Sequence, residues 1–208
     1  MDHPPRPHRP APHADLTAFI DAAGGLTPSS RAEIAAATAA VLVQAGRSPG
    51  EEADDRFVGL ADTVGIDTLA ALWQDSDPVS LPGALWALYL LRQWFRSNGE
   101  EVRRLWCAGE PLAPAEAVVA GVAEPGDVES VRRVADEILT GVYRGDFAVA
   151  LERAAAVFRV VAAGRRFFAD TAAPTQPQLA ELELAERNDR VAADLAAAAK
   201  RWRAGALS

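Results

Sequence analysis

The sequence predicts an all-α fold: an irregular bundle of about eight or nine helices that ends in a long C-terminal helix. Three observations lead to this prediction. Apolar residues recur at helical spacing along most of the chain. Several residue pairs have the spacing of a capping box or a close relative of it, with Ser, Thr or Asn three residues before Glu or Gln. Almost no segment alternates apolar and polar residues as a half-buried strand does.

The composition divides the chain into four parts. Residues 1–13, MDHPPRPHRPAPH, are rich in proline, which neither continues a helix nor pairs in a sheet, so we expect a disordered leader. Residues 14–170 are expected to form the helical core domain. Two prolines then mark a linker over 171–177, and a last helix is expected over 178–204.

Capping signals and apolar stripes place the first helices. The capping pairs are Ser30 with Glu33, Ser48 with Glu51, Asn98 with Glu101, and Thr175 with Gln178. Two apolar stripes follow the first two pairs: Ile34, Thr38, Val41, Leu42 and Ala45, then Phe57, Leu60, Ala61 and Val64. Each stripe covers one face of a helix, so we expect two amphipathic helices in this part of the chain.

The middle of the chain predicts a central helix and a helical hairpin. Residues 82–96, PGALWALYLLRQWFR, are apolar nearly all round, as a helix surrounded by other helices requires. Two further stripes are Val128, Val131, Ala135, Ile138 and Val142, then Phe147, Leu151, Ala154, Phe158 and Val161. The short turn between them predicts an antiparallel pair, with Asp146 as the cap of the second helix.

The last helix carries a seam of residues spaced by four and three in alternation, with one polar member. Its members are Leu184, Asn188, Val191, Leu195, Ala198 and Trp202. Such a seam packs either on the chain's own core or on a second chain. Three heptads with alanine in one layer favour the first arrangement.

The composition excludes several functional classes. All three histidines lie in the leader and Cys107 is the single cysteine, so the helical body cannot assemble a Ser-His or Cys-His pair or most kinds of zinc site. We therefore predict a non-catalytic protein with no cofactor and no metal. The net charge of -8 argues against general nucleic-acid binding, which needs a concentrated positive field.

The sequence also predicts a cytoplasmic protein without membrane contact. Prolines interrupt any apolar run that the leader would need as a signal peptide. The most hydrophobic run, from Leu81 to Leu91, covers about half of the roughly 20 residues of a membrane span. A buried helix accounts for this run.

The function that we expect is binding to another protein, or self-association, through the last helix and the arginine and aromatic residues that end the preceding one. The candidate interaction residues are Leu184, Asn188, Val191, Leu195, Trp202, Arg165, Arg166, Phe167 and Phe168. Arginine and large aromatic residues are enriched among the residues that dominate binding at interfaces. The helix dipole alone also accounts for arginine at the end of a helix.

A first alternative is a regulator that binds a small apolar ligand in an aromatic pocket. The candidate pocket residues are Trp73, Trp86, Tyr89, Trp94 and Trp106. Aromatic side chains line many ligand sites, but a cluster of this kind also forms the densest part of a core.

A second alternative is a Mg²⁺-dependent enzyme acting on a diphosphate, with carboxylates on facing helices. Its candidate residues are Glu51, Glu52, Asp54 and Asp55 near one helix start, with Glu183, Glu186 and Asp189 on the last helix. The same acids also complement a helix dipole or form a solvated face.

Two resemblances bear on the fold. Residues 139–158, LTGVYRGDFAVALERAAAVF, resemble part of a tetratricopeptide repeat, but one residue instead of three separates Tyr143 from Gly145, and no copy recurs at a period of about 34 residues. Over residues 65–166, SLPGALWALYLLRQWFR and GVYRGDFAVALERAAAVFRVVAAGRR resemble an uncharacterised helical family of high-GC, actinobacterial-type bacteria. That resemblance implies bacterial origin and an all-α fold, and no activity transfers from it. The excess of alanine, and of arginine over lysine, also indicates a high-GC genome.

Overall fold

A computed structural model describes residues 27–46, 66–121, 127–144, 146–170 and 175–208. Within these ranges every regular element is a helix and no strand occurs. The prediction of an all-α fold with a long C-terminal helix is therefore confirmed. The proline-rich leader and the expected helix around Phe57 and Leu60 lie outside the described residues.

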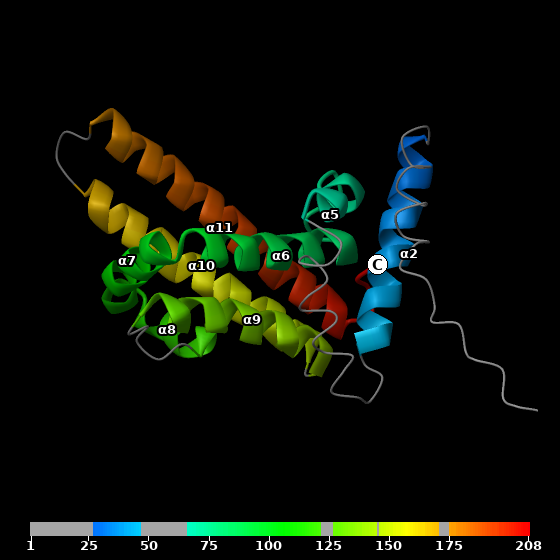
Figure 1. The fold of residues 1–208 in the computed structure, drawn as a ribbon. Helices are drawn as coiled ribbons and strands as arrows, with labels where there is room; N and C mark the ends of the chain where they lie inside the picture. The colour runs from blue at the N-terminus through cyan, green and yellow to red at the C-terminus, as the bar shows by residue number, and fades with distance from the viewer. Residues whose placement is uncertain (1–26, 47–65, 122–126, 145, 171–174) are drawn as a thin grey trace, which may run out of the picture.

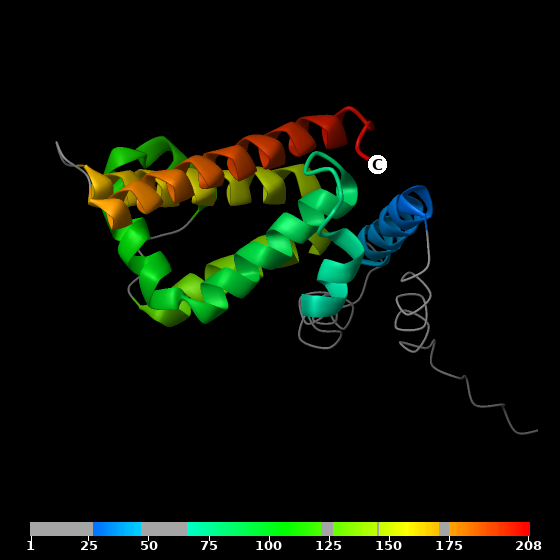
Figure 2. The same cartoon turned by 90° about the horizontal axis from the view of Figure 1, so that it is seen from above.

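The described helices form a bundle in which two long helices cross the molecule side by side (Figure 1). In chain order they are α2 (Pro28–Gly46), α5 (Ile66–Trp73), α6 (Leu81–Ser97), α7 (Gly99–Gly109), the 3-10 helix η1 (Glu110–Leu112), α8 (Pro114–Ala120), α9 (Val128–Arg144), α10 (Phe147–Ala169) and α11 (Gln176–Arg203). The view from above shows α11 beside α10, and α6 beside α9 (Figure 2).

Side chains cap several of these helices, and two of the expected caps are confirmed. Asp146 accepts a hydrogen bond from the backbone nitrogen of Ala148 at 2.8 Å and starts α10. Thr175 and Gln178 form the expected capping box of α11.

One expected helix start differs from the structure, and one expected cap makes no side-chain hydrogen bond. The helix α2 begins at Pro28, where the Thr27 hydroxyl accepts from the backbone nitrogen of Ser30 at 3.3 Å, so Ser30 lies in the first turn and is not its cap. Asn98 does precede α7, but its side chain makes no capping hydrogen bond. A capping spacing in the sequence thus locates a helix start only to within a turn.

The helix pair α10 and α11 forms the spine of the bundle. The α10 helix is buried along nearly its whole length, and α7, α8, α9, α6 and α11 all pack against it. Many of the buried residues of these two helices are alanines: Ala148, Ala150, Ala154, Ala155, Ala156 and Ala162 on α10, with Ala185, Ala192, Ala198 and Ala199 on α11. Small side chains let two helix backbones approach closely, so alanine has a packing role here beyond its genomic bias.

The helix expected to be central, α6, contacts many other helices but is not surrounded by them. Its buried face includes Leu85, Leu88 and Phe95. It contacts α9, α2, α5, α11, α10 and α7, while its exposed Leu90 faces solvent. The helix α6 therefore packs against the other helices along one face and is partly exposed on the other.

Two glycines set the contact between α7 and α10. A Cβ atom on Gly109 would collide with the carbonyl oxygen of Val160, and one on Gly164 would collide with that of Leu105. Both collisions involve backbone atoms, which cannot move aside as a flexible side chain can. Glycine is therefore required on both helices.

Candidate functional site

A groove of about 210 Å³ lies between α6 and α11. Its apolar lining comes from both helices and from α10, and one carboxylate joins it. The residues that define the groove here are Trp86, Leu90, Phe158, Val191, Leu195 and Asp194. Residues of the loop after α5 complete the lining.

Helical spacing places these side chains on facing surfaces. Trp86 and Leu90 are four residues apart on α6, as are Val191 and Leu195 on α11, so each pair lies on one helix face. Leu195 is 1% exposed whereas Leu90 is 42% exposed. The groove therefore has a buried floor and an exposed apolar rim.

The loop that completes the groove is held by a tight set of hydrogen bonds around Asp77. The carboxylate oxygen Oδ1 of Asp77 accepts from the backbone nitrogen of Val79 at 2.8 Å. Its backbone carbonyl accepts from the Ser80 hydroxyl at 2.6 Å, and that hydroxyl caps α6 by accepting from the nitrogen of Gly83 at 3.2 Å. A Cβ on Gly83 would collide with the Asp77 carbonyl, so glycine is required here for the loop to lie against α6.

Asp194 is the one carboxylate that lines this groove. Burial raises its pKa above the usual range, and the nearby charge of Asp77 raises the pKa further. Among the described residues no cation lies within ion-pairing distance of it, whereas on the same helix Glu181 lies 2.7 Å from Arg165 and Asp189 pairs with Arg166. Asp194 therefore stands out on α11 as a partly buried acid without a counter-ion among the described residues.

The groove unites members of two sets of candidate residues. Val191 and Leu195 belong to the expected interaction seam, and Trp86 belongs to the expected aromatic pocket. Asp194 and Leu90 were not among the candidate residues. The available signal was an acid beside the seam, three residues after Val191 and one before Leu195.

The other aromatic candidates do not converge on one pocket. Trp73 and Tyr89 are fully buried with ring centroids 6.0 Å apart, and the Trp73 indole nitrogen donates to the Thr38 hydroxyl at 3.3 Å. Trp94 packs edge-on against the ring of its neighbour Phe95, and Trp106 is buried in the core. These four side chains serve packing.

Arg165 is a buried tie between three helices. Its two terminal nitrogens donate to Glu181 on α11 at 2.7 Å and to Glu101 on α7 at 3.2 Å. Its guanidinium carbon lies 5.6 Å from the ring centroid of Trp94, a cation–π distance. At 5% exposure the side chain is not available to a partner.

The remaining interaction candidates have mixed surroundings. Arg166 pairs with Asp189, and Phe168 lies beneath the guanidinium of Arg104 at 4.4 Å, whereas Phe167 is exposed. Trp202 packs edge-on against the buried Phe147 at a centroid distance of 4.8 Å. Leu184 and Asn188 are half-buried, and the Asn188 side-chain nitrogen is buried without a hydrogen-bond partner.

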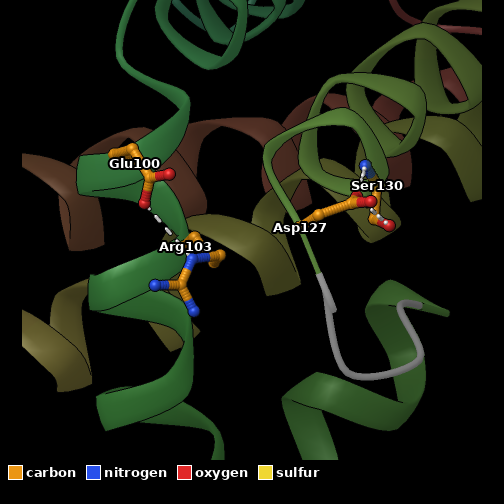
Figure 3. Close-up of polar contacts among 4 residues, drawn as sticks. All are labelled: Glu100, Arg103, Asp127 and Ser130. Carbon is orange, nitrogen blue, oxygen red and sulfur yellow. Dashed lines mark hydrogen bonds and ion pairs between the residues drawn. The ribbon is translucent and has the colours of Figure 1, made fainter.

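An open hollow of about 600 Å³ between α7 and the start of α9 is lined mainly by charged residues. Figure 3 shows contacts of three of its lining residues: Arg103 donates to Glu100 at 3.3 Å, and Asp127 accepts at 2.7 Å from both the backbone nitrogen and the hydroxyl of Ser130. These hydrogen bonds with Ser130 hold the pKa of Asp127 below its usual value. The charges in this figure are thus satisfied by neighbours on their own helices.

Two larger hollows lie beside α2. The first, of about 420 Å³, holds charges of both signs, with Arg31 at 4.0 Å from Asp75. The second, of about 430 Å³, is lined by alanines together with Val43, Leu81 and Trp202. The first is also lined by Asp77, whose carboxylate accepts a hydrogen bond from the backbone nitrogen of Val79, and the second has no charged side chain in its lining.

The acids of the diphosphate hypothesis do not form a site in the described part of the chain. The cluster that begins at Glu51 lies outside it. On α11, Glu183 and Glu186 are exposed and Asp189 pairs with Arg166. In the described ranges no three His, Cys, Asp or Glu residues converge as metal ligands would.

Within those ranges, no helix has both the length and the apolar character of a membrane span. Comparison with known protein families, with curated proteins and with solved structures finds no match for this chain.

Proposed function

We propose that this chain is a non-catalytic binding protein, and that the groove between α6 and α11 receives apolar side chains from a segment of another protein. The observation that carries this proposal is the apolar groove itself, with a buried floor at Leu195 and an exposed rim at Leu90. Burial of exposed apolar surface is the main favourable term in protein association.

The size of the groove favours a protein segment over a small ligand. Its volume is about 210 Å³. Pockets for small molecules usually enclose roughly 300 to 1,000 Å³ and surround most of the ligand. A smaller, open groove suits one or two side chains of a partner whose remaining contacts lie on the surface around it.

We further propose that the protein acts in the cytoplasm of a bacterium. Cys107 is a single, exposed, free thiol, and thiols of this kind remain reduced in the cytoplasm. The abundance of alanine and arginine fits a high-GC bacterial genome.

Photo-cross-linking tests the proposed groove. A benzophenone amino acid replaces Leu90 in the full-length protein, produced in its own cells. The matched control replaces Val149 on α10, which does not line the groove and is 43% exposed against 42% for Leu90. We expect a discrete product with one other protein from position 90 alone.

The partner segment identified by mass spectrometry is then synthesised and its affinity measured by calorimetry. We expect Val191→Glu to weaken binding at least tenfold, because it places a charge in the apolar wall, and Val118→Glu on α8 to leave it unchanged. A product linking two copies of this chain would make self-association the function. Equal products from positions 90 and 149, or equal affinities for both glutamate variants, would overturn the groove as the binding site.

A further inference from the structure

Two carboxylates give the groove a negative end. Asp194 lines the groove from α11. Asp77 lies close enough to repel it electrostatically, and it lines the adjoining hollow, which shares Ser76 with the groove. The hydrogen bond from the nitrogen of Val79 at 2.8 Å fixes the Asp77 carboxylate in place.

The basic residues near this end have other partners. Arg31 lines the same hollow as Asp77 and lies 4.0 Å from Asp75. On α11, Arg190 lies 4.0 Å from Glu186, and Arg201 donates to the carbonyl oxygen of Val79 at 3.0 Å. The lining from α6 and α10 contains no charged side chain. Among the described residues, no cation therefore lies within ion-pairing distance of Asp194 or Asp77.

An uncompensated carboxylate beside an apolar wall selects among ligands. A purely apolar segment that covers Asp194 strips water from the charge and offers nothing in return, which is unfavourable. An acidic segment adds repulsion. A basic side chain supplies the missing counter-ion, and a charge-assisted hydrogen bond in a partly desolvated site is stronger than one in open water.

We propose that the partner segment presents an arginine or lysine beside an apolar residue, with the cation against Asp194 and Asp77 and the apolar side chain between Trp86 and Val191. The proposal rests on the proposed function and specifies the chemistry of the partner. The indole ring of Trp86 adds a face on which a cation is attracted. The groove thus recognises a basic-apolar pair of side chains.

Three probes that share one apolar body test this proposal on the full-length protein: 4-phenylbutylammonium, 4-phenylbutanol and 4-phenylbutanoate. Binding is followed by the NMR signal of the Trp86 indole NH, assigned with Trp86→Phe. We expect the ammonium ion to bind at least tenfold more tightly than the alcohol, and the carboxylate to bind more weakly than both. Asp194→Asn is expected to bring the ammonium and the alcohol within about twofold of each other.

Matched variants separate charge from fold. Asp77→Asn keeps the oxygen that accepts from Val79 and removes only the charge, so it is expected to weaken ammonium binding and spare alcohol binding. Glu183→Gln makes the same charge change about 16 Å away along α11 and is expected to alter neither. Equal binding of all three probes, or an unchanged ammonium preference in Asp194→Asn, would overturn the basic-apolar partner while the groove remained a binding site. Failure of all three probes to shift the Trp86 signal would also overturn it, and the cross-linking at position 90 decides the proposed function separately.

Discussion

At the scale of single residues, Asp194 is a partly buried carboxylate whose charge is unfavourable to the folded state. Burial and the neighbouring Asp77 raise its pKa, so the ionised form is less stable in the folded protein than in the unfolded chain. The folded state therefore binds this proton more tightly. Ionised Asp194 lowers the free energy of unfolding at neutral pH, and the loss disappears as the pH falls below the ordinary value near 3.8.

Asp194→Asn is accordingly expected to raise the urea midpoint of unfolding at pH 7 and to leave it unchanged at pH 3. Glu183→Gln serves as the control at both pH values. A midpoint that falls at pH 7 would show that the carboxylate stabilises the fold and that its charge is compensated. A variant that is more stable yet loses the ammonium preference would separate the binding role of Asp194 from any structural one.

Arg165 has the opposite character, because its charge is buried and paired. Removal of one member of a buried ion pair leaves the other members without a partner and usually lowers stability by about 3 to 5 kcal/mol. Glu101 and Glu181 retain some contact with water, so we expect a loss of about 3 kcal/mol for Arg165→Met, measured by urea unfolding. Addition of Glu101→Gln and Glu181→Gln to the Arg165→Met variant should recover part of the lost stability.

The neighbouring Arg166 provides the comparison. Its side chain is 47% exposed and its pair with Asp189 lies at the surface, where such pairs contribute about 1 kcal/mol or less. Arg166→Met is expected to stay within that limit. Equal losses for the two arginine variants would contradict the role of Arg165 as the tie between α7, α10 and α11.

At the scale of elements, the crossing of α7 and α10 depends on glycine. Gly164→Ala places a methyl group against the backbone of Leu105, so the helices must separate, and overpacking of this kind costs about 1 to 3 kcal/mol. Gly141→Ala on α9 is the control. Its new Cβ would lie 3.7 Å from the Cβ of Ala150, an ordinary contact, and alanine has the higher helix propensity. Calorimetric melting should show a lower Tm for the first variant and an equal or higher Tm for the second.

The last helix is an integral part of the core. Leu195 and four of its alanines are buried, and the α10 face beneath them would be exposed without it. Removal of residues 175–208 is therefore expected to abolish cooperative thermal unfolding followed by circular dichroism. A truncated chain that melts cooperatively and stays monomeric in light scattering would contradict this and would favour an assembly role for α11.

At the scale of the whole molecule, sequence patterns predict the features that depend on interactions between residues close together in the chain. The fold class, the cap at Asp146 and the capping box at Thr175 all follow from contacts within a few residues, and the structure confirms them. The seam on α11 was also visible as a face. The helices that pack against this face could not be predicted, because the spacing of residues along one helix does not specify its neighbours.

The candidate site shows the same limit. Trp86 and Val191 were assigned to different hypotheses, and only tertiary packing places them in one groove. Asp194 looks like an ordinary solvated acid in the sequence, since its special environment comes from α6, α10 and the loop of Asp77. Conversely, the aromatic candidates Trp73 and Tyr89 became core residues because helices from separate parts of the chain surround them.

The pairing of α10 and α11 is fastened on both sides of the groove. Arg165 holds Glu181 near the start of α11, and Arg203 holds Glu152 at 2.5 Å near its end. Val191, Asp194 and Leu195 lie between these two fastenings, so the position of one wall of the groove depends on charges that a bound segment would not touch. Under the proposed function, mutations at these distant pairs would change how strongly a partner is bound and leave the residues that contact it unchanged. For such a binding protein, natural selection could then act on affinity and on specificity through different residues.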